Sequence, residues 1–211
     1  MLQGASKTTL LFGWQALSLD EHKLESIRNS IHESSANTWI VTALAGLPAL
    51  LPHLTSVSKD LHNHAGALLQ SLVRWLKHNE SYSPDFTKNN ILLTPLTVVH
   101  HLLQYTVFLQ ARYPRLDPDA RFRAAHNTTE VTGFCSGLIS AFAVSEAHDV
   151  ASFEAMGAVA IRMAMMCGLV VDEQNLAQPV PSQTSAIAVA WPSNASQHSI
   201  DDVLSQFPEV C

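Results

Sequence analysis

The sequence has few of the residues that mark secreted, nucleic-acid-binding or membrane-targeted proteins. Its 211 residues include 3 cysteines, too few and too scattered for a disulfide framework, which favours a reducing intracellular compartment. The 12 Lys and Arg residues are outnumbered by 18 Asp and Glu and form no basic stripe, so we expect no nucleic-acid partner. Residues 1–9 contain no apolar run, which predicts no signal peptide. Together these features predict a cytoplasmic protein.

The sequence also gives no indication of a metal site or of a membrane-spanning helix. The 11 histidines are dispersed and do not form a ligand set, so we expect no bound metal. The most apolar stretch, Ile91–Leu109, is long enough at ~20 residues to span a bilayer. It contains His100, His101 and Gln104 near its middle, however, and these polar groups would be costly in lipid. We therefore predict a buried or half-buried helix and no membrane partner.

The composition that remains is that of a globular protein with a large core. Apolar residues make up 47% of the chain and charged residues 14%. Hydrophobic periodicity and helix-breaking residues predict alternating strands and helices, and therefore an α/β fold. The expected strands are Thr8–Phe12, Thr128–Thr132 and Ala186–Trp191; the expected helices begin at Asp20 and Ser199 or cover Asp60–His78, Ile91–Arg112, Leu138–Glu146 and Ser152–Leu169, with a short or broken helix in Ile40–Leu51, loops at Ser81–Asn90 and around Pro114 and Pro118, and a linker over Val170–Ser185.

Residues 133–137, in the order Gly-Phe-Cys-Ser-Gly, form the strongest motif for chemistry. A nucleophile works well on a sharp strand-to-helix turn, and the tight crossing requires small residues two positions before and two after it. Gly133 and Gly137 satisfy that spacing around Cys135. The helix expected to follow would direct its positive end at Cys135 and favour the thiolate. The alternative is that Cys135 is a small buried residue in an ordinary turn.

Two loops are candidates for the donors of an oxyanion hole. The backbone N–H groups that follow Cys135 point towards the developing oxyanion, and the loop Gly13-Trp14-Gln15 follows the first expected strand. Two donors from two loops are the usual arrangement in such sites. A plain turn at Gly13 is the alternative, and the spacing does not exclude it.

Arg162 is the single basic residue in the otherwise uncharged stretch 156–166. It is either a cation fixed near the site, where it would orient a carbonyl group, or a residue at the edge of the helix whose charge reaches water.

Several of these segments together resemble the starter-unit acyl carrier protein transacylase domain of fungal non-reducing polyketide synthases. The matching pieces are residues 11–15 (Leu-Phe-Gly-Trp-Gln), 92–98 (Leu-Leu-Thr-Pro-Leu-Thr-Val), 133–138 (Gly-Phe-Cys-Ser-Gly-Leu), and 160–162 (Ala-Ile-Arg) on a helix that ends in 168–172. They occur in the family's order, and the resemblance covers nearly the whole chain.

The resemblance implies an acyltransferase with a malonyl-transacylase-like, hydrolase-type core. Cys135 would take a short acyl group from coenzyme A, or from the carrier of a fatty-acid synthase, and pass it to the phosphopantetheine thiol of a polyketide synthase carrier domain. Gln15 and Ser136 would donate to the oxyanion, and Arg162 matches the arginine of the acyl pocket. No permanently bound cofactor is implied, since acyl-CoA or acyl-phosphopantetheine is the substrate.

The resemblance also implies a division of the chain. Residues 1–178 would form the large acyltransferase subdomain, and 179–211 the start of a ferredoxin-like small subdomain. The family's general base is a histidine from a later segment, and no histidine stands in the matching position before Cys211. We therefore expect a chain truncated before that histidine. The alternative function is a non-catalytic remnant that docks a carrier protein.

Overall fold

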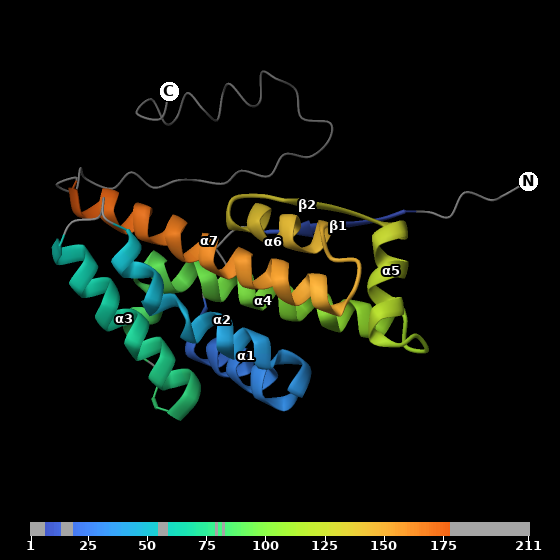
Figure 1. The fold of residues 1–211 in the computed structure, drawn as a ribbon, viewed down its shortest axis with the longest axis horizontal. Coiled ribbons are helices and arrows are strands. Elements are labelled where there is room, and N and C mark those ends of the chain that lie inside the picture. The colour runs from blue at the N-terminus through green and yellow to red at the C-terminus, as the bar shows by residue number, and fades with distance from the viewer. Residues whose placement is uncertain (1–6, 14–18, 55–58, 79, 82, 178–211) are drawn as a thin grey trace, which may run out of the picture. The chain divides into compact units, whose positions relative to one another are not determined.

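Helices dominate the computed structural model, which describes residues 7–13, 19–54, 59–78, 80–81 and 83–177 (Figure 1). The described part is a mostly helical α/β arrangement with a small parallel sheet, which confirms the predicted α/β class at this level. The elements in order are β1 (Thr8–Phe12), α1 (Glu21–Glu33), the 3₁₀ helix η1 (Ser35–Asn37), α2 (Thr38–Ala45), η2 (Leu47–His53), α3 (Lys59–His78), η3 (Pro84–Thr87), α4 (Asn90–Arg112), α5 (Pro118–Thr128), β2 (Thr129–Gly133), α6 (Ser136–Ser145) and α7 (Val150–Ala177).

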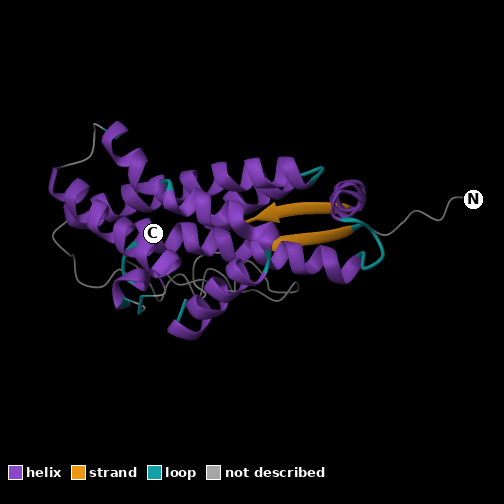
Figure 2. Cartoon of the chain, turned by 60° about the horizontal axis from the view of Figure 1, so that its bottom comes forward, coloured by secondary structure: helices purple, strands orange, loops and turns teal. Residues whose placement is uncertain are grey.

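The sheet brings together two strands that are far apart in the sequence. β1 and β2 run parallel, with Leu10 opposite Val131 and Phe12 opposite Gly133. Both strands agree with the prediction, the second beginning one residue later than expected. Because the strands are parallel, Phe12 and Gly133 end them at the same edge of the sheet (Figure 2).

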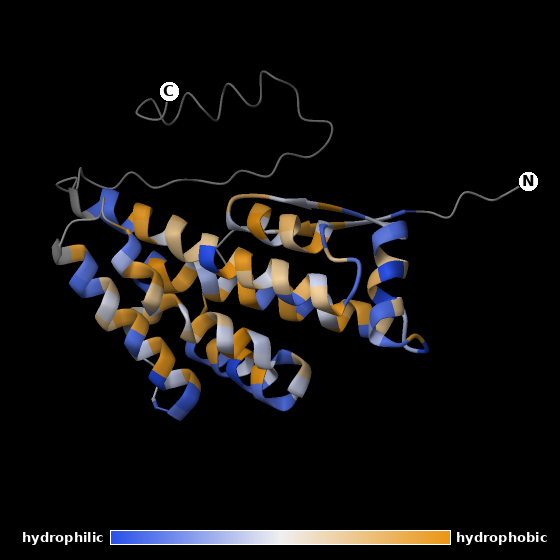
Figure 3. Ribbon diagram, in the orientation of Figure 1, coloured by the Kyte–Doolittle hydropathy of each residue, from blue (hydrophilic) through white to orange (hydrophobic). Residues whose placement is uncertain are grey.

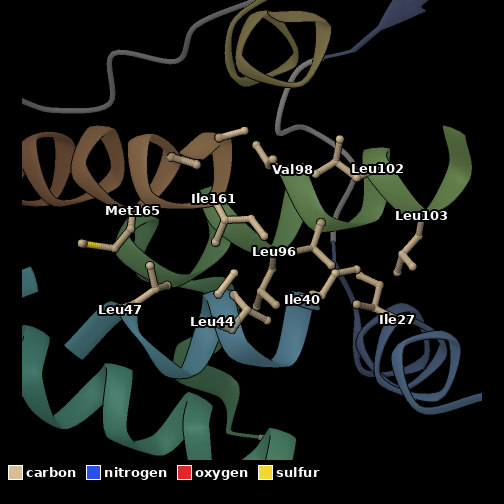
Figure 4. Packing of buried hydrophobic residues seen from close by; sticks show 14 of the residues in the cluster. Ile27, Ile40, Leu44, Leu47, Leu96, Val98, Leu102, Leu103, Ile161 and Met165 are labelled. Atoms are coloured by element: carbon tan, nitrogen blue, oxygen red, sulfur yellow. The ribbon is translucent and has the colours of Figure 1, made fainter. Parts of the chain in front are cut away.

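The core lies around α4, which packs against α7, α6 and the helices of the N-terminal half. Figure 4 shows Leu96 of α4 among Leu44 of α2, Leu47 of η2, and Ile161 and Met165 of α7, all of them buried. α4 and α7 are each long and apolar enough to cross a membrane by length and composition alone. In α4, 67% of the apolar window is buried within the fold. The predicted buried helix is therefore confirmed, and Figure 3 shows apolar colour along both helices.

α7 is longer than predicted, and the linker expected over Val170–Ser185 is wrong as far as Ala177. The reason is a contact across the fold. The carboxylate of Asp172 accepts hydrogen bonds from the backbone N–H groups of Asn90 at 3.0 Å and Ile91 at 2.9 Å, at the start of α4. It thus satisfies amides that have no partner inside their own helix, and it fixes the last turns of α7.

α5 was not predicted, because Pro118 and its charged neighbours suggested a loop. The side chain of Asp117 caps the helix by accepting from the N–H of Ala120 at 2.9 Å. Pro118 is tolerated because it lies in the first turn, where its missing N–H would have no partner. Phe122 and Ala125 then bury one face of the helix. Asp117 and Pro118 therefore begin a helix, where the sequence analysis expected a loop.

The other described α-helices agree with the prediction, whereas the short 3₁₀ helices η1 and η3 were not predicted, and η3 lies within the loop expected at Ser81–Asn90. Asp20 caps α1 by accepting from the N–H of Lys23 at 2.8 Å, and the apolar stretch Ile40–Leu51 is divided into α2 and η2. The strand expected at Ala186–Trp191 and the helix from Ser199 lie outside the described residues.

Candidate functional site

Cys135 occupies a sharp turn between β2 and α6. Its backbone has φ 56° and ψ −128°, and it is the only non-glycine residue with positive φ in the described part of the chain. Such a conformation is costly for a residue with a side chain and is typical of functional turns. The side chain of Cys135 is exposed, and α6 begins at the next residue. The turn therefore presents a free thiol at the N-terminal end of a helix.

Gly133 and Gly137 let the backbone cross itself at this turn. A Cβ atom on Gly133 would lie 2.2 Å from the carbonyl oxygen of Gly137, and one on Gly137 would lie 2.2 Å from that of Phe12. Neither glycine has a positive φ, so space and not backbone conformation requires them. The sequence predicted that a tight backbone crossing requires small residues at these two positions, and the structure shows that crossing.

Hydrogen bonds tie the turn to β1 and close it. The N–H of Phe134 donates to the carbonyl of Phe12, and that of Gly137 donates to the carbonyl of Phe134, both at 3.0 Å. The N–H of Leu138 donates to the carbonyl of Cys135, also at 3.0 Å. The N–H of Ser136 takes part in none of these described bonds, and as the first amide of α6 it has no acceptor within its helix. The N–H of Ser136, beside the thiol, thus has no acceptor among the described bonds, although Ser136 itself is 5% exposed.

The other two predicted site residues, Gln15 and Arg162, are not shown at the Cys135 turn. Gln15 lies outside the described residues. Gly13, two positions earlier, lies close to the turn, since a Cβ atom on Gly137 would be 2.4 Å from the carbonyl oxygen of Gly13. Arg162 is exposed on α7, which packs against α6, and it forms no ion pair within the described residues. Of the predicted site residues, the structure therefore places Cys135 and Ser136 in the turn, and it shows no contact between Arg162 and the turn.

Comparison with known proteins identifies the family. The model of the family described as "Starter unit:ACP transacylase in aflatoxin biosynthesis" matches residues 10–210. The chain belongs to the starter unit:ACP transacylase family. Curated relatives include clavatol synthase claF of Penicillium crustosum (34% identical over 95% of the chain), the non-reducing polyketide synthase pigA of Monascus ruber (36% over 96%) and the citrinin polyketide synthase of Monascus purpureus (32% over 95%).

The chain spans about 8% of the length of each of these relatives. The transacylase family is one of acyltransferases, and the match supports a role in starter-unit transfer during polyketide biosynthesis.

Large apolar side chains flank Cys135, the candidate nucleophile. Phe134 is 65% exposed and Leu138 is 63% exposed, one on each side of the turn. Exposed apolar residues of this size around a thiol can contact the hydrocarbon part of a ligand.

One feature beside the site was not foreseen. His101 of α4 is buried, and its Nδ1 lies 2.9 Å from Oγ of Ser140 in α6. Burial lowers the pKa of His101 to about 4, so the ring is neutral near pH 7. In the sequence, His100 and His101 stand out only as polar residues within the apolar stretch Ile91–Leu109. Nothing in the sequence pointed to Ser140 as the partner, because the two residues are far apart along the chain.

Proposed function

We propose that this chain is an acyltransferase that loads the starter acyl group in polyketide biosynthesis, with Cys135 as the nucleophile. One observation carries the proposal. In a member of the starter unit:ACP transacylase family, the residue in a strained conformation at a strand-to-helix turn is an exposed cysteine.

In the first half-reaction, the sulfur of Cys135 attacks the carbonyl carbon of an acyl-CoA or an acylated fatty-acid synthase carrier. The new carbon–sulfur bond gives a tetrahedral intermediate, and its collapse breaks the bond to the donor's sulfur. The donor's sulfur leaves as a thiolate and takes up a proton in place of the one that Cys135 gave up on attack, and the acyl group stays on Cys135 as a thioester. The N-terminal end of α6 attracts negative charge, which stabilises the developing oxyanion.

The N–H of Ser136 donates to the oxyanion of that intermediate, and the backbone of Gln15 supplies the second donor. The free amide of Ser136 beside the thiol and the approach of Gly13 to the turn both support this arrangement. Donors fixed by the fold before the reaction need no reorganisation as the charge develops, which is why such sites stabilise the transition state strongly.

In the second half-reaction, the phosphopantetheine thiol of a polyketide synthase carrier domain attacks the Cys135 thioester and takes the acyl group. The exposed apolar side chains of Phe134 and Leu138 suit a short hydrocarbon acyl group. Arg162, on the helix beside α6, would orient its carbonyl group. Acyl-CoA and the acylated carrier are substrates, so no resident cofactor or metal is needed.

The proposal extends to the rest of the chain. Residues 1–178 would form the large subdomain of a hydrolase-type acyltransferase core, and 179–211, which lie outside the described residues, would be the start of a ferredoxin-like small subdomain. The proposed acyl transfer takes place in the cytoplasm, together with the carrier partner.

The test is a two-step transfer followed by intact mass. The protein is incubated with a short acyl-CoA, freed of excess reagent, and mixed with a carrier domain bearing phosphopantetheine. We expect an acyl adduct on the protein that moves to the carrier, and no transfer with Cys135→Ala. The matched control is Cys167→Ala, which removes the other exposed cysteine of the described residues and should leave transfer unchanged. Binding of the carrier without any acyl transfer would contradict the proposal and assign the chain a docking function instead.

A further inference from the structure

His101 contacts the helix that carries the nucleophile at its N-terminus. The residue is 3% exposed, and its Nδ1 is 2.9 Å from Oγ of Ser140, which is fully buried. Ser140 lies a little over one helical turn beyond Cys135 on α6. Because neutral imidazole has one N–H and one acceptor nitrogen, it can pair with a hydroxyl as donor or as acceptor.

The same ring also contacts the strand to which the turn is tied. The ring of His101 lies 5.5 Å from that of Phe12, measured between centroids. The carbonyl of Phe12 accepts the N–H of Phe134 and lies where a side chain on Gly137 would have to go. His101 therefore touches both structures that define the position of Cys135, which are the end of β1 and the helix α6.

His101 also lies at the edge of a cavity. The cavity, of about 320 Å³, runs between β1 and α4, and its lining includes Phe12, Gly13, His101 and Gln104. The bond to Ser140 fixes the orientation of the imidazole beside this cavity, since a buried and satisfied polar pair specifies one packing arrangement.

We propose that His101 is a positioning residue, which uses its hydrogen bond to Ser140 and its contact with Phe12 to hold the Cys135 turn in register with the end of β1. In this role it acts through Ser140 and Phe12, and not directly on the reacting sulfur. The catalytic part of this inference rests on the proposed acyl transfer, whereas its structural part does not.

Three variants separate this role from plain stability. His101→Leu removes the hydrogen bond and leaves the Ser140 hydroxyl buried without a partner. Ser140→Ala removes the same bond, keeps the ring against Phe12 and is mild enough for the protein to fold. His101→Asn keeps a polar group near the position of Nδ1 and is the conservative control.

Two measurements are made on each variant. The first is the rate of acyl transfer from acyl-CoA, analysed as kcat and KM separately. The second is amide hydrogen exchange of the peptide containing residues 134–140, with peptides from α3 as an internal reference. Exchange needs no activity, so it reports on positioning even if acyl transfer fails.

We expect kcat to fall about tenfold or more in His101→Leu with KM little changed, because a nucleophile displaced by a fraction of an ångström loses reactivity rather than affinity. Exchange at the turn should speed up while α3 stays as in the wild type. Ser140→Ala should shift both quantities in the same direction, and His101→Asn should recover most of each. Wild-type exchange at the turn in both Ser140→Ala and His101→Leu would overturn the inference. Faster exchange in a protein that never transfers acyl groups would overturn the proposed function but not the positioning role.

Discussion

Replacing Gly137 by alanine tests the close crossing of the backbone beneath Cys135. The new Cβ would lie 2.2 Å from the carbonyl oxygen of Phe12 and 2.4 Å from that of Gly13. Both are backbone atoms, which cannot rotate away as the end of a side chain could. Overpacking of this kind costs about 1–3 kcal/mol. Helix propensity alone predicts the opposite sign, because Ala is favoured over Gly inside a helix by about 1 kcal/mol.

Gly66 is the matched control, since it also lies within a helix, α3. A Cβ there would meet only a side-chain carbon of Leu51, at 3.8 Å, which is ordinary van der Waals contact. Gly66→Ala should therefore raise the free energy of unfolding by up to about 1 kcal/mol, whereas Gly137→Ala should lower it.

Urea unfolding followed by circular dichroism measures both changes. Heating should show a fall in Tm of about 2–4 °C for each kcal/mol lost in a chain of this size. A Gly137→Ala protein as stable as the wild type, or more stable, would refute the close crossing on which the geometry of the turn depends.

Three further outcomes follow from contacts away from the thiol. Asp172→Ala should lower the free energy of unfolding by about 1–3 kcal/mol in urea titration, because the N–H groups of Asn90 and Ile91 lose their acceptor; an unchanged midpoint would contradict the cap. Gly168→Ala should cost about 1–3 kcal/mol, since its Cβ would lie 2.1 Å from the carbonyl oxygen of Asn90; wild-type stability there would argue against the close approach of α7 to α4. Burial lowers the pKa of His101 to about 4 from the ordinary 6.5. As the pH falls, the unfolded chain is therefore protonated at this histidine before the folded one. The free energy of unfolding of the wild type should fall between pH 6.5 and pH 4, by at most about 3 kcal/mol. His101→Asn should remove that part of the slope, and a variant with the same pH dependence as the wild type would show that His101 is not the cause.

The sequence predicts this site well where the interactions are local. Two glycines placed symmetrically around Cys135 are visible as a pattern, and the crossing that needs them lies within a few residues. The apolar run before Gly13 likewise identifies β1, because a buried strand followed by a turn residue is a short-range signal.

Two of the failures have the same cause, which is a partner distant in the sequence. The last turns of α7 depend on Asp172 meeting Asn90, and no local pattern around Val170 reveals that contact. In the same way, the doublet of His100 and His101 could be seen, but the buried hydroxyl of Ser140 could not be assigned to it.

α5 fails for a different reason. Pro118 has two opposite meanings, a helix start or a loop, and the cap from Asp117 decides between them. A residue that both breaks and begins helices is ambiguous until its neighbour's role is known.

The central claim is that the acyl group is carried by Cys135, and peptide mapping after incubation with acyl-CoA tests it most directly. The mass increase should lie on the peptide containing Cys135, disappear with hydroxylamine as a thioester does, and persist in Cys167→Ala. An acyl group found on another residue, or one that remains in Cys135→Ala, would contradict the claim.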